Sequence, residues 1–419
     1  MMERYSEYKD SGVKWLGEIP SHWEVMPLKS FIKFEKGKTP KEFSDENNGL
    51  PYLTMDYLRS RDNKIVKYPI SSVGLFKIEE FEALVLWDGA NAGEFILSKK
   101  GYLGSTMAKI SGYRKYYNNL YFYYFLKMLE PTSKNFANGT TIPHFDASIL
   151  INYHYPIPPI DEQKAIGSYL DSATSEIDKA IAMQQKMIDL LNERKQIIIQ
   201  NAVTKGLDEN VEMKESGVEW IGRIPKHWEV RRGKFLFRVV NEYSTTGQEE
   251  LLTVSDRTGI TPRCMKNVNM FMSESLIGYK KCQKGDICSN IMWMWHGAVG
   301  VTEYNGVISP SYGVYRQIAV NYDNKYLDYM LRLPRLVEVY GICSTGLTES
   351  RLRLYPDDFM NIQFFIPPVE EQKSIVLQIQ KQITDIEKSI RNAENLITLL
   401  QERKQIIINE VVTGKVRVS

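Results

Sequence analysis

The sequence is poor in cysteine and has no long apolar run. Its four cysteines, scattered among 419 residues, form no CxxC pair, which argues against a disulfide scaffold and a structural zinc site. No apolar stretch approaches the roughly 18 residues that a transmembrane helix requires. The N-terminal sequence MMERYSEYKD is too polar for a secretory signal. These absences predict a reduced, cytoplasmic protein without a membrane span.

Sequence patterns typical of catalysis are absent as well. No GxxxxGK[ST] loop is present, because Gly37-Lys38-Thr39 lacks the upstream glycine, and no GxGxxG follows a strand-like run. The five histidines form no HExxH. Both Pro-Pro pairs follow isoleucine, so neither belongs to an NPPY-like methyltransferase motif. We therefore expect neither a catalytic centre nor a metal or cofactor bound by this chain.

The net charge of 53 − 51 = +2 does not by itself indicate a nucleic-acid-binding protein. The charges are unevenly distributed, however. Residues 26–157 carry 17 Lys and Arg against 13 Asp and Glu, and residues 231–360 carry 16 against 13. The remaining segments carry 20 against 25. The basic excess therefore falls in two separate stretches of the chain.

An internal repeat is the strongest feature of the sequence. Residues 8–25 (YKDSGVKWLGEIPSHWEV) and 213–230 (MKESGVEWIGRIPKHWEV) are identical at 12 of 18 positions, with an offset of 205. Two further pairs of segments match at an offset of 209: IPPIDEQKAIG (157–167) with IPPVEEQKSIV (366–376), and LLNERKQIII (190–199) with LLQERKQIII (399–408). Between them, residues 26–154 and 231–363 look unlike each other.

The repeat therefore predicts a duplicated scaffold that presents two diverged modules. The alternative is a two-domain protein whose halves have drifted apart. That alternative does not explain why the ends of the two halves stayed alike while their middles did not.

Each IPP sequence predicts the start of a long helix, because proline interrupts regular structure but is tolerated in a first helical turn. Acidic residues follow at once in both copies, where the helix dipole favours them. Apolar residues then alternate at spacings of four and three, as in a coiled-coil seam. Residues 161–204 would extend over about 66 Å if fully helical. Two such helices in one chain most simply pack antiparallel on each other.

The predicted seam consists of Ile166, Leu170, Ala173, Ile177, Ala180, Met187, Leu191 and Ile198 in the first helix, and Ile375, Ile379, Ile386, Ala393, Leu396, Leu400 and Ile407 in the second. Additional apolar residues, such as Ile181 and Ile188, widen each face beyond what one helix would cover. Either the chain's own modules or a partner protein covers the excess. We favour a partner, and expect it to bind Leu191, Arg194, Ile198, Leu400, Arg403 and Ile407.

The repeated segments before each variable stretch contain tryptophans that we interpret as packing anchors: Trp15, Trp23, Trp220 and Trp228. His22 and His227 precede a tryptophan in both copies. A histidine repeated within a structural segment is more often hydrogen-bonded in packing than catalytic, and we predict that role here.

The motifs SGVxWxGxIPxHWEV, IPPxxEQK and LLxERKQIII each occur twice, in the same cyclic order. With them, the whole chain resembles the specificity subunit of type I restriction-modification systems. The sequence Gly139-Thr140-Thr141-Ile142-Pro143-His144 in the first variable stretch also fits this family. The second stretch departs from the pattern, with Ser344-Thr345-Gly346-Leu347-Thr348 farther from its IPP sequence.

The resemblance implies that each variable stretch is a target recognition domain reading one half of a split, asymmetric site in double-stranded DNA. The helices would fix the length of the unread gap. The chain itself would be non-catalytic. Its partners would be two methyltransferase subunits, which use S-adenosylmethionine to methylate adenine, and restriction-translocation subunits.

We expect an α+β fold in which two mixed recognition domains are joined by two long antiparallel helices that form a coiled-coil spacer, with an internal pseudo-two-fold repeat. Strands are predicted at Leu84–Leu86, Ile65–Tyr68 and Gly313–Ile318, and helices at Asn119–Met128 and Tyr326–Leu333. The expected boundaries are 1–25 for an N-terminal repeat segment, 26–157 for the first recognition domain, 158–205 for the first spacer helix, 206–230 for a linker, 231–365 for the second recognition domain and 366–419 for the second helix and tail.

We expect loops of both variable stretches to contact DNA. Lysines can neutralise phosphates, Asn91 suits adenine, and arginine suits guanine, although each is also compatible with an ordinary solvated surface. The candidates are Lys36, Lys38, Thr39, Lys41, Asn91, Thr140, Thr141 and His144 in the first stretch, and Arg257, His296, Thr345, Thr348, Arg351 and Arg353 in the second. Beside His296, Trp293 and Trp295 are expected in the core rather than at DNA.

Two other functions stay open at this point: a protein-interaction scaffold and a stand-alone DNA-modifying enzyme. Methylation or cleavage of DNA by the chain alone would favour the enzyme. DNA binding that is absent or insensitive to salt would favour the scaffold, because contacts to phosphates weaken as salt rises.

Overall fold

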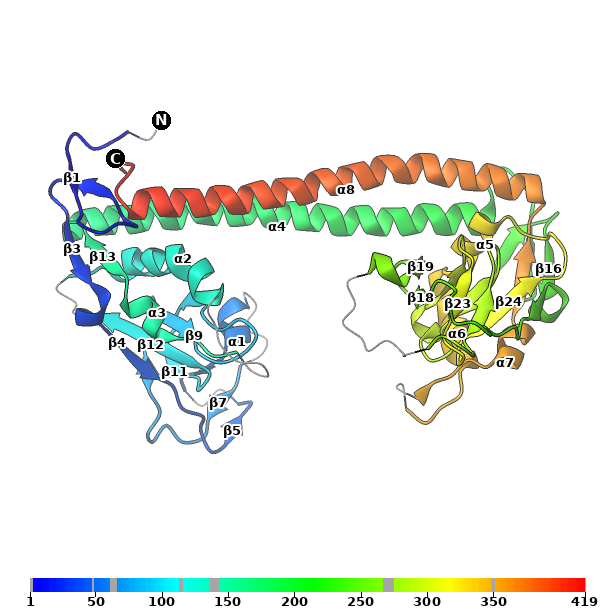
Figure 1. The fold of residues 1–419 in the computed structure, drawn as a ribbon, viewed down its shortest axis with the longest axis horizontal. Coiled ribbons are helices and arrows are strands. Elements are labelled where there is room, and N and C mark those ends of the chain that lie inside the picture. The colour runs from blue at the N-terminus through cyan, green and yellow to red at the C-terminus, as the bar shows by residue number, and fades with distance from the viewer. Residues whose placement is uncertain are drawn as a thin grey trace. The chain divides into compact units, whose positions relative to one another are not determined.

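The computed structural model describes residues 3–46, 49–60, 66–112, 116–135, 143–266, 275–348 and 351–418 (Figure 1). The chain divides into two compact units. Unit 1 comprises Met1–Lys186 and Ala393–Ser419, and unit 2 comprises Met187–Asn392. Each unit therefore contains one variable stretch of the sequence together with one end of each long helix.

Both units contain part of α4 (Ile160–Lys205) and part of α8 (Val369–Val412). The other elements of unit 1 are β1 (Tyr8–Asp10), β2 (Glu18–Pro20), β3 (Glu24–Pro27), η1 (Leu28–Ser30), β4 (Ile32–Lys36), β5 (Phe43–Ser44), β6 (Tyr52–Leu53), α1 (Met55–Arg59), β7 (Tyr68–Pro69), β8 (Lys77–Ile78), β9 (Ala83–Leu86), β10 (Phe95–Leu97), β11 (Gly101–Leu103), β12 (Met107–Gly112), α2 (Asn119–Asn135), α3 (Ala147–Ile151) and β13 (His154–Ile157).

The other elements of unit 2 are β14 (Met213–Glu215), β15 (Arg223–Pro225), β16 (Glu229–Arg232), η2 (Gly233–Phe235), β17 (Phe237–Val239), β18 (Leu252–Ser255), β19 (Gly259–Pro262), η3 (Arg263–Met265), β20 (Lys280–Cys282), β21 (Ile287–Ser289), η4 (Met294–His296), β22 (Val299–Val301), β23 (Gly306–Ile308), β24 (Gly313–Gln317), α5 (Asn324–Leu331), α6 (Pro334–Cys343), α7 (Pro356–Asn361) and β25 (Gln363–Ile366).

The two variable stretches share one topology despite their unlike sequences. Unit 1 contains a four-stranded sheet in the order β10-β9-β12-β4, and unit 2 contains one in the order β22-β21-β24-β17. All neighbouring strands in both sheets are antiparallel. Each unit also has a hairpin, β1-β2 or β14-β15, and a strand pair that leads into its long helix, β13-β3 or β25-β16. The duplication predicted from the ends of the two halves therefore extends to the fold of their middles.

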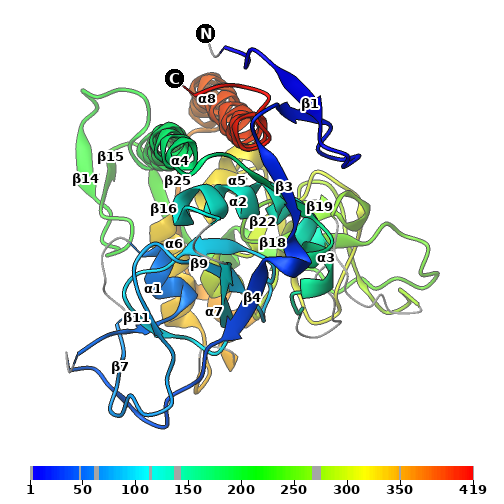
Figure 2. The ribbon, with the colours of Figure 1, turned by 90° about the vertical axis from the view of Figure 1, so that its left-hand side faces the viewer.

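Within each unit, α4 and α8 lie side by side and run in opposite directions (Figures 1 and 2). In unit 1, Lys404 Nζ donates to Asp178 Oδ2 at 2.7 Å, and in unit 2, Lys195 Nζ donates to Glu387 Oε1 at 2.6 Å. These two ion pairs are related by the repeat, because both lysines belong to the ERKQIII sequence. The structure confirms the predicted mixed α and β fold with two long helices.

Shorter elements were predicted with varying success. The strands at Leu84–Leu86 and Gly313–Ile318 correspond to β9 and β24, and the helix at Asn119–Met128 is the first part of α2. The helix predicted at Tyr326–Leu333 ends early, since α5 stops at Leu331 and Pro334 starts α6. Ile65 lies outside the described residues, and the nearby strand β7 begins at Tyr68.

The coiled-coil seam follows the predicted positions in the first part of α4 and in α8 as far as Ala393, where Ile375, Ile379, Ile386 and Ala393 are all buried. Ile166, Leu170 and Ile177 are buried, but the exposed fractions of Met187 and Leu396 are 40% and 41%. Those two predicted seam positions are therefore wrong, and Ile188 is buried in place of Met187. The cause is geometric: a straight helix has 3.6 residues per turn and drifts by about 20° per heptad from a strict 3.5-residue repeat.

A glutamate in the first turn of each long helix binds the HW sequence of its own unit. In unit 1, Glu162 accepts from Trp23 Nε1 at 3.2 Å, and its other oxygen lies 2.8 Å from His22 Nε2. In unit 2, Glu371 lies in the same way 3.2 Å from Trp228 Nε1 and 2.7 Å from His227 Nε2. The interpretation of both histidines as hydrogen-bonded packing residues is confirmed. Trp23 and Trp228 are fully buried.

The glutamine that follows this glutamate is buried and makes three hydrogen bonds to the main chain in both units. Gln372 Oε1 accepts from the Asp323 amide at 2.8 Å, and its Nε2 donates to the carbonyls of Asn321 and Pro367. Gln163 makes the equivalent bonds to Asn118, Tyr116 and Pro158. One side chain thus joins the start of the long helix to the loop that precedes a module helix.

We expect Gln372→Leu to destabilise unit 2 by on the order of 3 kcal/mol, because it leaves buried main-chain groups without a hydrogen-bond partner. Urea unfolding followed by circular dichroism gives the change, and hydrogen exchange of α5 assigns it to unit 2. The exposed neighbour Lys373→Ala is the matched control. A loss for Gln372→Leu no larger than that of Lys373→Ala would contradict this role.

Candidate nucleic-acid interface

In unit 1, strand order brings two of the predicted DNA-contacting loops to one edge of the sheet. Strands β4 and β9 both pair antiparallel with β12, so they point the same way. Lys36 at the end of β4 pairs with Ala108, and Leu86 at the end of β9 pairs with Met107. The loops that follow these strands therefore emerge next to each other, at the start of β12.

A third loop joins them through main-chain bonds. The Phe145 amide donates to the Trp87 carbonyl at 2.8 Å, and the Gly89 amide donates to the Pro143 carbonyl at 3.0 Å. His144 is thereby placed opposite Asp88. Pro143 and His144 thus form one surface with the loop after β9, although the two segments lie far apart in the sequence.

Asp88 holds two of the predicted DNA-contacting side chains. Its Oδ1 lies 2.7 Å from His144 Nδ1, and its Oδ2 accepts from Lys36 Nζ at 3.0 Å. The Lys36 ammonium also lies 5.6 Å from the centre of the Trp87 ring. We call these side chains the Lys36–Asp88–His144 cluster. Asp88 was not among the predicted site residues, because its partners become visible only once the three loops are placed together.

The electrostatics of the cluster keep its carboxylate ionised. Partial burial alone would raise the pKa of Asp88, but hydrogen bonds from His144 and Lys36, together with their charge, hold the pKa below its ordinary value. An ionised Asp88 fixes both donors in place. His144 and Lys36 are themselves exposed, and Nε2 of His144 is not the nitrogen engaged by Asp88. These groups can therefore contact phosphates or base edges.

The basic loop after β4 lies close against the start of β12. The Gly37 amide donates to the Met107 carbonyl at 3.0 Å, and Thr39 Oγ1 donates to Ser105 Oγ at 2.8 Å. A Cβ at position 37 would lie 2.2 Å from the Gly104 carbonyl oxygen, so only glycine fits this approach. Beyond it, Lys38 and Lys41 are exposed, as is Asn91 in the loop after β9. Thr140 and Thr141 lie outside the described residues.

In unit 2, the loop equivalent to the one after β9 carries different side chains. The Leu354 amide donates to the Ile291 carbonyl at 3.0 Å, which is the counterpart of the bond between Phe145 and Trp87. Gly93 and Gly297, which close the two equivalent loops, both have a left-handed φ, 88° and 89°. Counting back from these glycines aligns Gly89 of unit 1 with Trp293 of unit 2. The second loop thus has an indole where the first has no side chain.

Trp293, Trp295 and His296 form an aromatic group in this loop. The His296 ring lies 4.0 Å from the Trp295 ring and 5.1 Å from the Trp293 ring, measured between centroids. Trp295 is half-buried and donates from Nε1 to the Met292 carbonyl. Trp293 is 54% exposed, so the prediction that it lies in the core is wrong. Trp293 directly precedes the short helix η4, and its indole is exposed whereas the side chain of Met294, the next residue, is buried.

The remaining predicted residues of unit 2 fall in two places. Thr345 and Arg353 face each other in an antiparallel bridge, and the Arg351 amide donates to the Thr348 carbonyl at 2.8 Å, so these four residues form one loop after α6. Arg257 belongs to a separate element, the turn between β18 and β19. Arg332 Nη2 donates to its carbonyl at 2.8 Å.

The long helices expose a different apolar set from the one predicted. Leu191, Ile198, Leu400 and Ile407 are half-buried, whereas Arg194 and Arg403 are exposed. Ile160 and Leu377 are exposed near the starts of the two helices; farther along, the exposed large apolar side chains are Met183, Met187, Leu190 and Ile197 on α4 and Leu396, Leu399 and Ile406 on α8. Leu190 and Ile197 match Leu399 and Ile406 at the repeat offset, so this set of exposed apolar residues is itself duplicated. We call the seven residues from Met183 to Ile197 and from Leu396 to Ile406 the exposed stripe.

No three His, Cys, Asp or Glu side chains of the described residues lie together in a way that could hold a metal ion. Within the same residues, no helix combines the length and the apolar composition of a membrane span.

Comparisons with known proteins agree with this architecture. The family model of the type I restriction modification DNA specificity domain matches residues 20–186. A chain from a solved structure on complex assembly and conformational transition of a type I R-M system has a TM-score of 0.66 at 13% identity, over 94% of this chain and 98% of that chain. At that identity the likeness shows the fold alone.

Two sequence relatives extend over nearly the whole chain. The EcoBI specificity subunit of Escherichia coli is 23% identical, over 92% of this chain and 85% of its own length. The MjaVIII specificity subunit of Methanocaldococcus jannaschii is 30% identical, over 98% of this chain and 97% of its own length. The chain thus belongs to the family of type I restriction enzyme specificity subunits, which determine the DNA sequence on which such an enzyme acts.

Proposed function

We propose that this chain is a non-catalytic subunit that recognises a split, asymmetric DNA site, one half with each unit, and directs adenine methyltransferase and restriction subunits to it. One observation carries the proposal: two recognition modules share a topology and a scaffold, but differ in chemistry at the same loop. Like modules with different loops are what reading two different half-sites requires. We place this activity in the cytoplasm.

The exposed groups of unit 1 suit hydrogen bonding to DNA. Lys36, Lys38 and Lys41 offer positive charge to phosphates, and His144 and Asn91 offer polar groups to base edges. In unit 2, Arg351 and Arg353 can play these roles, and Trp293 adds a flat apolar surface for stacking or for contact with a thymine methyl group. The two half-sites are therefore read by different kinds of contact.

The long helices would set the distance between the two half-sites. Each of them continues from one unit into the other, over 46 residues in α4 and 44 in α8. Inserting or removing whole turns should then change the unread gap and leave both half-sites as they are. The exposed stripe would bind two methyltransferase subunits, which supply S-adenosylmethionine and the catalytic centre that this chain is expected to lack.

Methylation mapping in a methylation-free host tests the proposal. We expect adenine methylation at a single split motif only when this chain and a type I methyltransferase subunit from the same operon are expressed together. Each protein alone is the control. Methylation by this chain alone would make it an enzyme. No methylation in any arm, with the two proteins still co-purifying, would favour a protein-interaction scaffold.

Asp88→Asn separates specific from non-specific binding. The variant loses the charge that holds Lys36 and His144, so we expect affinity for the mapped site to fall about ten-fold, as for a lost charge-assisted hydrogen bond. Binding to unrelated DNA at low salt should not fall, because the protein becomes more positive. Fluorescence anisotropy measures both. Glu35→Gln, which removes a carboxylate beside Lys33 on the same strand, is the control.

Trp293→Ala should weaken binding of the mapped site about ten-fold, since stacking of a base on an aromatic ring contributes roughly 1–3 kcal/mol. Trp293→Phe keeps an aromatic ring and should retain most of the affinity. Val320→Ala, which truncates another exposed apolar residue of unit 2, should bind as the wild type does. Equal affinity of Trp293→Ala and wild type would exclude this contact.

A further inference from the structure

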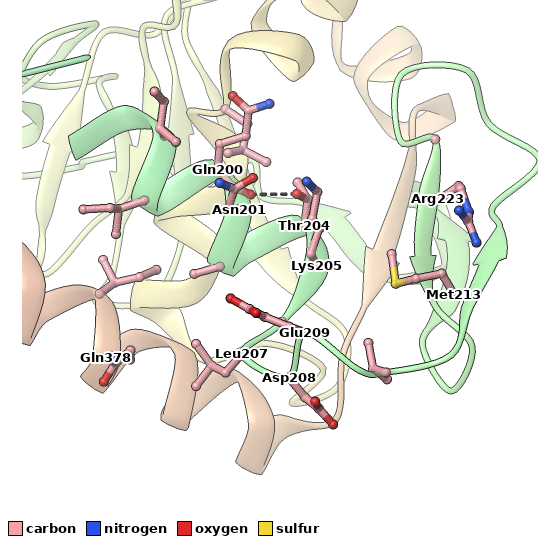
Figure 3. A pocket seen from close by; sticks show the side chains of 18 of the residues that line it. Gln200, Asn201, Thr204, Lys205, Leu207, Asp208, Glu209, Met213, Arg223 and Gln378 are labelled. Carbon is pink, nitrogen blue, oxygen red and sulfur yellow. Dashed lines mark hydrogen bonds between the residues drawn. The ribbon is translucent and has the colours of Figure 1, made fainter. Parts of the chain in front are cut away.

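The repeated segments enclose a pocket of about 1000 Å³ in unit 2, between the end of α4, the segment that follows it and the β14-β15 hairpin (Figure 3). Charged residues of both signs line it, among them Lys205, Asp208 and Arg223. None of the residues predicted to contact DNA lines this pocket. Unit 2 therefore does not read bases inside it, and the apolar side chains available to DNA are those that project from the surface.

Three apolar side chains project from the surface of unit 2 that is proposed to face DNA. The exposed fractions are 95% for Leu347, 82% for Ile342 and 54% for Trp293. Ile342 lies near the end of α6, Leu347 in the loop that follows, and Trp293 in the loop after β21. A single exposed leucine is ordinary, but several large apolar side chains on one surface are typical of a binding site.

These side chains belong to one surface because the two loops are joined at their bases. The Leu354 amide donates to the Ile291 carbonyl, which ties the end of the loop after α6 to the start of the loop after β21. A Cβ added at Gly341 would lie 3.9 Å from the Cβ of Trp295, so the end of α6 packs against the aromatic group. Ile342, the next residue of α6, therefore lies beside that group.

The loop after α6 presents Leu347 on a fixed base. Thr345 and Arg353 exchange two main-chain hydrogen bonds, each of 2.9 Å. Between them, a Cβ at Gly346 would lie 2.5 Å from the Arg351 carbonyl oxygen, so only glycine allows this close approach. The loop therefore has little conformational freedom to lose when Leu347 meets a ligand, and such preorganisation favours binding.

DNA offers apolar surface in two places. One is the C5 methyl group of thymine in the major groove, and the other is the faces of the bases inside the stack. The methyl group can be reached without unstacking the duplex. Thr348 and Arg351, on the same loop as Leu347, are of the residue types that hydrogen-bond to base edges in that groove. A leucine among such donors therefore suits a thymine methyl group better than the interior of the stack.

The equivalent surface of unit 1 lacks this feature in its described parts. Residues 87–93 and 143–146 expose no large apolar side chain. They carry the polar Lys36–Asp88–His144 cluster and Asn91 instead. Among the described residues of these loops, apolar contact to a base is therefore available only in unit 2.

We propose that Leu347 determines specificity at a thymine of the half-site that unit 2 reads, by covering the thymine methyl group in the major groove. Ile342 and Trp293 flank this contact and exclude water from it. The proposal rests on the proposed function for DNA as the ligand. It adds the kind of base that one side chain selects, since cytosine has no methyl group at this position.

Replacing single thymines of the mapped site by deoxyuridine tests this, because each replacement removes one methyl group and keeps every hydrogen-bonding group. Binding by the chain assembled with its methyltransferase subunit is measured by fluorescence anisotropy. We expect the wild type to bind about four-fold more weakly when the contacted thymine is replaced, as for one methyl group left unburied. Leu347→Ala should bind the thymine site about ten-fold more weakly than the wild type and should no longer distinguish deoxyuridine at that position.

Two matched variants complete the experiment. Leu347→Met keeps a large apolar side chain and should still distinguish thymine from deoxyuridine. Val320→Ala truncates another exposed apolar residue of unit 2 and should behave as the wild type does. Circular dichroism melting confirms that the variants are folded, which the exposure of both positions favours.

The outcomes separate this contact from the function on which it rests. If Leu347→Ala still distinguishes thymine from deoxyuridine wherever the wild type does, the leucine contacts something other than a methyl group, such as the faces of unstacked bases, and the proposal is overturned. A wild type that is insensitive to every single replacement would also overturn it. Both results leave the DNA-specificity function intact. A wild-type complex that does not prefer the mapped site to unrelated DNA would contradict the proposed function itself.

Discussion

The structure depends on a Glu-Gln pair that opens each long helix. Glu162 and Glu371 bind the tryptophan and histidine of the HW sequence, and the glutamines that follow them bind main-chain groups of the adjoining module. Since the glutamines are buried, replacing them leaves polar groups without partners, which costs more than a surface contact contributes. A helix start, a hairpin segment and a recognition module are thereby fixed to one another. The repeated sequences are alike because they make the same contacts twice.

On that frame the modules are free to differ where they face a ligand. The loop after β9 and the loop after β21 emerge from equivalent strands and return at glycines with nearly the same φ. One carries a carboxylate that holds a lysine and a histidine, and the other carries an exposed indole. Changing such a loop leaves the sheet, the helix start and the HW contacts untouched. Specificity can thus diverge without loss of the fold.

Features that depend on residues close together in the sequence, or on the internal repeat, could be predicted. Proline, acidic first-turn residues and apolar spacing located both long helices, and the repeat identified the packing histidines. The sequence was uninformative where the outcome depends on contacts between distant residues. The strands are only two to six residues long, too short to give a clear sequence pattern, so the common topology of the modules could not be predicted. Asp88 gains its role from residues 52 and 56 positions away. Ile188 is buried in place of Met187 because a straight helix drifts from the heptad repeat, and Trp293 is exposed although Met294 beside it is buried.

The closure of unit 1 by the end of α8 has a consequence for synthesis. Unit 2 is one continuous stretch, Met187–Asn392, whereas the core of unit 1 includes Ile408, Val411 and Val412. Tyr121 Oη, inside that core, donates to the Val412 carbonyl. On the ribosome, residues 1–186 therefore emerge first but stay without part of their core until the last helix is released. Domains generally fold in the order in which they emerge. Here that order is reversed: unit 2 can complete its core while unit 1 still waits, with apolar surface exposed, for the end of α8.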